Sequence, residues 1–146
     1  MQIKISPAAE SDLDAIAALE AENFSLPWKR ADFAVMRAEP DRCLLAAKAD
    51  GELVGYIGAY TVARETDVTT VAVRADKRRA GVGQALLEAL CAALAGKSDV
   101  IFLEVRESNA SARRLYARCG YTEIGVRRGY YAKPTEDAVL YRKTLS

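Results

Sequence analysis

The order of extended and helical segments limits the possible folds more than any other feature. Continuous or alternating apolar patterns predict strands, and apolar residues three or four apart predict helices. Strands are expected at residues 2–5, 43–47, 53–62, 68–73, 100–105, 121–126 and 138–141, and helices from Ser11 toward Pro27 and at 29–38, 81–95 and 108–119. Three strands therefore follow one another, and helices separate only the later ones. This order predicts an α/β (α+β) fold with a mixed, mostly antiparallel sheet flanked by helices and one β-α-β crossover.

Composition narrows the class of protein. The 146 residues suit one domain, residues 1–146, and 51% are hydrophobic while 28% are charged, as in globular proteins. The net charge of +1 gives no global field for nucleic acid or an anionic membrane. No apolar run approaches the roughly 20 residues that span a bilayer, and the N-terminus lacks the apolar core of a signal peptide. We expect a cytoplasmic protein without nucleic-acid or membrane partners.

The chain has no histidine and only three widely spaced cysteines. Zinc sites built on histidine and Ser-His or Cys-His nucleophile pairs are therefore excluded, and no metal is expected. Cys43, Cys91 and Cys119 are interpreted as small apolar residues in a reducing compartment. Any chemistry must use carboxylates, tyrosines, lysines or backbone amides.

A glycine-containing loop in VAVRADKRRAGVGQALL, residues 71–87, joins a predicted strand to a predicted helix. Unpaired N–H groups at a helix N-terminus favour phosphate, and Gly81 and Gly83 allow close approach of the backbone. A Walker loop is excluded because Gln84 stands where lysine is required, and a dinucleotide fingerprint because Leu86 replaces its third small residue. The remaining pattern is [QR]xxGx[GA]. A simple glycine turn with a solvated basic rim is the alternative.

One carboxylate interrupts the apolar strand at 100–105. Glu104 shares a strand face with Phe102, whereas Ile101, Leu103 and Val105 share the other face. A carboxylate among apolar neighbours loses hydration and binds a proton more readily, which suits a proton acceptor. The alternative is a carboxylate at the strand end, close to Arg106 and paired on the surface.

The helix that follows carries two candidate residues seven positions apart. Asn109 and Tyr116 fall on one helix face, about 10 Å apart. An asparagine amide can bond an amide-bearing chain such as pantetheine. A tyrosine is protonated at neutral pH and can give its proton to a leaving thiolate. Taken alone, Asn109 has the alternative of an ordinary residue at the N-terminus of a helix, and Tyr116 that of an ordinary half-buried aromatic residue.

Together these segments resemble the GNAT superfamily of N-acetyltransferases, and particularly its RimI-type ribosomal-protein-alanine N-acetyltransferases. The resemblance covers nearly the whole chain through NFSLPW, ETDVTTVAV, RRAGVGQALLEAL, LEVRESNASARRLY and RRGYYAKPTEDA. Small departures are Arg78, where glutamine is common, and the sequence CGY at 119–121 in place of LGF. The resemblance implies the GNAT acyl-CoA N-acyltransferase fold and acetyl-CoA as co-substrate.

The resemblance also implies roles for individual residues. In that family the Glu of the LEVR motif is the general base and the Tyr that ends SNxxAxxLY is the general acid, here Glu104 and Tyr116. Contacts to acetyl-CoA would fall on Val71, Ala72, Val73, Arg78, Arg79, Ala80, Gly81, Val82, Gly83, Gln84 and Asn109. Tyr130 and Tyr131, expected in a loop between the last two strands, would line the peptide groove, with Trp28 as its opposite wall. Aromatic packing in a hairpin is the alternative for either tyrosine.

The implied reaction is direct acetyl transfer in a ternary complex to the α-amine of a protein N-terminus, the N-terminal alanine of a small-subunit ribosomal protein. An α-amine with a pKa near 8 is roughly one-tenth neutral at pH 7, whereas lysine is neutral only about once in a few thousand molecules. One carboxylate therefore suits an α-amine better. A lysine or small-amine acetyltransferase and a non-catalytic acyl-CoA-binding module remain open. The sequence does not indicate the oligomeric state.

Overall fold

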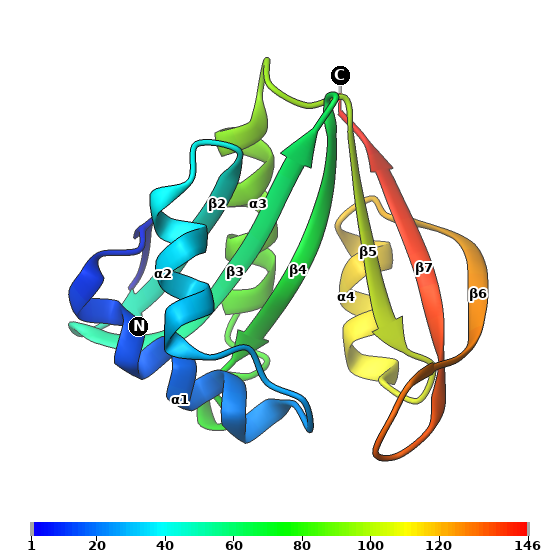
Figure 1. Cartoon of the computed structure of the whole chain (residues 1–146), viewed down its shortest axis with the longest axis horizontal. Helices are drawn as coiled ribbons and strands as arrows, with labels where there is room; N and C mark the ends of the chain where they lie inside the picture. The colour runs from blue at the N-terminus through cyan, green and yellow to red at the C-terminus, as the bar shows by residue number, and fades with distance from the viewer. Residues whose placement is uncertain (1, 146) are drawn as a thin grey trace.

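Seven strands form one sheet in the order β1-β2-β3-β4-β5-β7-β6 in the computed structural model, which describes residues 2–145 (Figure 1). The strands are β1 (Ile3–Pro7), β2 (Arg42–Ala49), β3 (Glu52–Val62), β4 (Glu65–Val73), β5 (Val100–Arg106), β6 (Thr122–Tyr131) and β7 (Glu136–Thr144). The helices are α1 (Leu13–Asn23), α2 (Arg30–Ala38), α3 (Val82–Leu94) and α4 (Ala110–Arg118). Of the six strand pairings only β4–β5 is parallel. The predicted fold class and crossover are confirmed.

The parallel pairing of β4 with β5 is short. It ends at Asp67 and Phe102, beyond which the two strands diverge (Figure 1). β5 continues along β7 over its full length, while β4 stays with β3, and the register of this pairing shifts between Gly58 and Ala59 of β3. Such a shift bends a strand. Within residues 2–145, the edge of β4 beyond Asp67 therefore faces an opening without a neighbouring strand, and we call this opening the fork.

Helices cover the sheet unequally. α3 and α4 lie behind the sheet, and α1 and α2 lie in front of β2, β3 and β4 (Figure 1). Leu86, Leu87, Leu90, Ile57, Ile101 and Leu103 belong to the core on the α3 side, and Leu13, Ile16, Phe33, Met36 and Tyr56 to the core under α1 and α2. The front of β5, β7 and β6 carries no helix from the described chain (Figure 1). None of the helices in residues 2–145 is long and apolar enough to cross a bilayer.

Two local expectations differ from the structure. The first helix begins at Leu13 after a 3-10 turn, and the Asp12 carboxylate, not Ser11, accepts the N–H of Ala9 at 2.8 Å. Residues 127–131 are the end of β6 and not a loop, because this segment continues to pair with β7 through a register shift at Gly129, whose φ is 62°. Asp50 and Gly51, both at positive φ, lie in the turn between β2 and β3.

Candidate active site

The loop between β4 and α3 forms a concave backbone surface beside the open end of the fork. Arg79 and Gly81 adopt positive φ values of 68° and 86°, and Gly81 is the residue before the helix. Successive N–H groups in such a conformation converge on a common point, a geometry that binds anions. The first hydrogen bond within α3 runs from the N–H of Ala85 to the carbonyl of Gly81. The N–H groups of residues 82–84 therefore have no partner within the helix and are available to a ligand. The backbone of this loop therefore has the shape expected of a phosphate cradle.

Some side chains predicted to contact the donor have other partners. Arg78 donates to Asn23 Oδ1 at 2.6 Å and to the carbonyl of Val73 at 3.3 Å, which braces the loop against α1 and β4. Gln84 donates to Glu88 one turn later at 2.9 Å. The cradle is thus built from backbone, and Arg78 supports its shape.

The apolar residues predicted at the donor site are core residues through their side chains. Ala72 packs under α1 and α2, Val82 lies in the core on the α3 side, and both are buried. A Cβ at Gly83 would lie 2.8 Å from a methyl group of Leu115, so this glycine lets α3 approach α4 closely. Ala72, Val82 and Gly83 therefore offer a ligand at the fork their backbone and not their side chains.

Glu104 lies on β5 two residues beyond the last residue paired with β4. Burial alternates along β5, so Glu104 faces the front of the sheet and not α3, as predicted. Its side chain is 27% exposed, and one oxygen lies 3.8 Å from the guanidinium of Arg127. The carboxylate is therefore closer to charge and water than the apolar strand sequence suggested. The reason is that β6 lies beside β7, the neighbour of β5, and this order places Arg127 near Glu104.

Two tyrosines at the end of β6 lie beside Glu104. The neighbouring Glu104 carboxylate raises the pKa of Tyr130 above its usual range. Burial and the Glu104 charge raise the pKa of Tyr131 to about 12. The two rings meet edge to face at 5.1 Å, and Arg106 stacks on Tyr131 at 4.6 Å from the ring centre. Both phenols therefore keep their protons near neutral pH and can donate hydrogen bonds.

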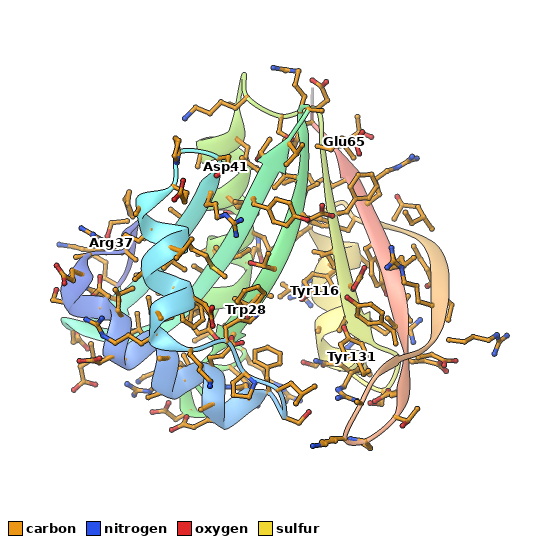
Figure 2. All side chains as sticks on the ribbon, in the orientation of Figure 1. Trp28, Arg37, Asp41, Glu65, Tyr116 and Tyr131 are labelled. Atoms are coloured by element: carbon orange, nitrogen blue, oxygen red, sulfur yellow. The ribbon has the colours of Figure 1, made fainter. Side chains whose placement is uncertain are left out.

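Tyr116 lies on α4 within a cluster of aromatic rings. It is 5% exposed, and its ring lies 6.0 Å from that of Tyr121 and 5.7 Å from that of Tyr141. Burial raises its pKa well above the ordinary phenol value, and the nearby Tyr131 acts in the same direction. In the view of Figure 2, Tyr116 lies in the opening between Trp28 on one side and Tyr131 on the other.

The remaining predicted residues, Asn109 and Trp28, are positioned by backbone contacts. Asn109 Oδ1 accepts the N–H of Ala112 at 3.1 Å, so this side chain caps α4. Trp28, in the segment between α1 and α2, is 39% exposed, and its backbone N–H donates to Glu20 Oε2 at 3.0 Å. Ser25 in the same segment reaches a carbonyl in the turn between β6 and β7 at 3.3 Å. The two predicted walls of the peptide groove are thus connected.

Sequence reasoning missed Glu20 and Arg127, and it placed Arg106 beside Glu104, whereas Arg106 pairs with Glu136 and stacks on Tyr131. Arg106 and Arg127 become neighbours of the tyrosines only through the strand order β5-β7-β6. Glu20 had a readable signal, since it follows Leu13 and Ile16 at helical spacing on the apolar face of α1. No cluster of three potential metal-ligating side chains occurs within the described chain.

The family model described as the acetyltransferase (GNAT) family matches residues 13–121. The chain belongs to the GNAT family. The Escherichia coli ribosomal protein bS18-alanine N-acetyltransferase is 34% identical over 97% of each protein, and the N-alpha-acetyltransferase RimI of Mycobacterium tuberculosis is 33% identical over 97% of this chain and 92% of that protein.

Solved structures share this GNAT fold. The crystal structure of the Escherichia coli ribosomal-protein-S18-alanine N-acetyltransferase matches with a TM-score of 0.88 at 30% identity, covering 99% of this chain and 95% of that one. Arabidopsis thaliana NAA60 in complex with a bisubstrate analogue matches with a TM-score of 0.88 at 21% identity, covering 98% of each chain. The same protein has been crystallised with acetyl-CoA.

Proposed function

We propose that residues 1–146 form a single GNAT domain that transfers acetyl from acetyl-CoA to the α-amine of a protein N-terminus, the N-terminal alanine of a small-subunit ribosomal protein. The names of the Escherichia coli and Mycobacterium tuberculosis relatives support this reaction. The observation that carries the proposal is the position of Glu104, at the fork two residues beyond the last residue paired with β4 and beside two protonated tyrosines.

The donor fits the fork and the cradle. The pyrophosphate would bind the N–H groups of residues 79–84, where Gly81 has nothing within 4 Å of an added Cβ and therefore leaves room for an anion. The amide-bearing arm would follow the unpaired edge of β4 at residues 71–73, as an added strand does. Acetyl-CoA, when bound, supplies the acetyl group as a reactive thioester. The crystallisation of NAA60 with acetyl-CoA supports this assignment at the level of the fold.

The residues around the fork then move two protons. The incoming ammonium gives a proton to Glu104, directly or through a water, and the neutral amine attacks the thioester carbonyl. As the carbon–sulfur bond breaks, Tyr116 Oη donates a proton to the departing sulfur, and the second proton that the nitrogen loses on forming the amide returns to the phenolate. The raised pKa of Tyr116 favours this return to the protonated phenol. Tyr130 and Tyr131 hydrogen-bond the backbone of the acceptor, and Trp28 covers its other side. No covalent enzyme intermediate is required.

Glu104 and its surroundings favour an α-amine over a lysine. An α-amine is roughly one-tenth neutral at pH 7, so a carboxylate suffices to remove its proton, whereas a lysine amine is about two pKa units more basic. One carboxylate, partly exposed and 3.8 Å from Arg127, is therefore better matched to an α-amine.

A peptide panel tests the proposal. Peptides that begin with alanine, serine, glycine, methionine or leucine, each with one internal lysine, are incubated with acetyl-CoA and analysed by tandem mass spectrometry. We expect one acetyl group on the α-amine, most rapidly on alanine. Acetylation of lysine alone would instead make the protein a lysine acetyltransferase, and calorimetric binding of CoA without acetylation of any amine would make it a binding module.

A further inference from the structure

A buried carboxylate lies beneath the segment that carries Trp28. Glu20, in the last turns of α1, is 1% exposed. Its Oε1 accepts hydrogen bonds from Tyr56 Oη on β3 and Thr70 Oγ1 on β4, both at 2.5 Å. Hydrogen bonds to an ionised oxygen are about twice as strong as neutral ones, and a buried charge requires such partners. These two hydroxyl groups therefore fix one oxygen of Glu20 to β4, which borders the fork, and to β3 beside it.

The second oxygen of Glu20 holds a different part of the chain. Oε2 accepts the backbone N–H of Trp28 at 3.0 Å. Trp28 lies between the end of α1 at Asn23 and the start of α2 at Arg30, in a segment outside both helices. This segment, residues 24–29 or the acceptor segment, exposes Phe24, Leu26 and Trp28 by 40%, 66% and 39%. A segment that exposes this much apolar surface gains little from packing, so hydrogen bonds to fixed groups must define its position.

The geometry points to Glu20 as a positioning residue for the acceptor. We propose that its carboxylate holds the acceptor segment at a fixed distance from β3 and β4, so that the Trp28 side of the groove is formed before the peptide binds. A carboxylate suits this position because it accepts three hydrogen bonds on two oxygens and brings no donor of its own. The role rests on the proposed acetyl transfer to a peptide, but the ordering of the segment is a separate physical property.

Removing the carboxylate while keeping its volume tests the role. In Glu20→Met the Trp28 N–H loses its acceptor, so amide hydrogen exchange in residues 24–29 should accelerate by about tenfold or more. The KM for an alanine peptide should rise by about tenfold, because the peptide must now order the segment on binding. The KM for acetyl-CoA should stay within about twofold, since the donor cradle touches other residues.

Tyr56→Phe is the matched control. It removes one hydroxyl group from the same carboxylate but leaves the bond between Glu20 and Trp28, so both exchange in residues 24–29 and the peptide KM should stay within about twofold of wild type. Glu20→Gln keeps an oxygen acceptor and should restore slow exchange partly, which also supplies a test if Glu20→Met does not fold.

Two results would overturn the inference. One is unchanged exchange of residues 24–29 in a folded Glu20 variant, and the other is an equal rise of the peptide KM in Tyr56→Phe, which would indicate a general loss of stability. If the wild-type protein acetylates no amine, the proposed function fails, yet the exchange comparison still decides whether Glu20 positions this segment.

Discussion

The donor and acceptor sides of the fork are built by different means. The donor side, the edge of β4 and the loop that precedes α3, consists of backbone groups shaped by Arg79 and Gly81 at positive φ. The acceptor side consists of side chains that lie far apart in the sequence, with Glu104 on β5 beside Arg127 and Tyr130 on β6. A backbone site is specified locally, whereas a side-chain site depends on how the strands are ordered.

This difference separates the effects of substitution. On the donor side a new side chain weakens the binding of acetyl-CoA, because it strains the backbone or blocks the site, while the groups that transfer protons are unchanged. On the acceptor side the exchange of one atom can remove proton transfer without changing shape. The following predictions test this separation, from the largest expected effect to the smallest.

Glu104→Gln should give the largest effect. The amide keeps the shape of the side chain but does not accept a proton, so kcat should fall by about 10² to 10⁴-fold while the KM for acetyl-CoA stays nearly constant. Steady-state kinetics with an alanine peptide measures both. Glu65→Gln is the control, because Glu65 is an exposed carboxylate at the closed end of the fork (Figure 2). Equal losses in both variants would show that net charge and not the position of Glu104 matters.

Tyr116→Phe should lower kcat by roughly 10 to 10²-fold, because the ring stays packed and only the donated proton is lost. Tyr121→Phe is a close control in the same aromatic cluster. The Tyr121 hydroxyl is buried and has no hydrogen-bond partner among the described residues, so its removal should leave kcat unchanged and leave thermal stability equal or higher. If Tyr121→Phe slowed turnover as much as Tyr116→Phe, the packing of the cluster and not the Tyr116 proton would limit the rate.

Gly81→Ala should act on donor binding alone. An alanine at a φ of 86° is strained by about 1 kcal/mol, and relaxing this strain turns the N–H groups of the cradle away from a common point. We expect the KM for acetyl-CoA to rise by roughly 5 to 10-fold with little change in kcat. Gly96→Ala carries matched strain, since its φ is 77° and its added Cβ also meets nothing within 4 Å, but it lies at the far end of α3. A similar rise in Gly96→Ala would contradict a local role for the cradle.

The sequence predicted the local structure of the donor side, a strand followed by a loop and a helix, better than the neighbours of Glu104 on the acceptor side, for the same physical reason. The glycine pattern and the strand and helix around it lie within residues 71–87, so local rules were sufficient. Seven strands in the correct chain order also followed from local apolar patterns and turns. The pairing of Glu104 with Arg127 depends instead on β7 lying between β5 and β6, which local patterns do not specify. Likewise, the contact of Arg78 with Asn23 joins residues 55 positions apart.

The smallest expected effect is a loss of folding stability at alkaline pH, to which the acceptor side contributes and the donor side does not. The pKa of Tyr131 is about 12 in the folded protein, whereas an unfolded tyrosine ionises near 10, so only the unfolded state loses this proton between these values. The stabilisation is complete below about pH 10 and is lost as the pH rises toward 12, because a raised folded-state pKa favours the protonated fold. Residues 71–84 contain no tyrosine, so the donor side contributes nothing to this loss.

Tyr131→Phe should therefore lose less stability than wild type between pH 8 and pH 11. We expect the gap between their unfolding midpoints to change by a few degrees over this range, measured by circular dichroism at matched ionic strength. Tyr60→Phe, which changes a tyrosine on β3, should follow the wild-type curve. Parallel curves for Tyr131→Phe and wild type would mean that Tyr131 titrates as in water, and the acceptor side would then be too open to order a peptide through this phenol.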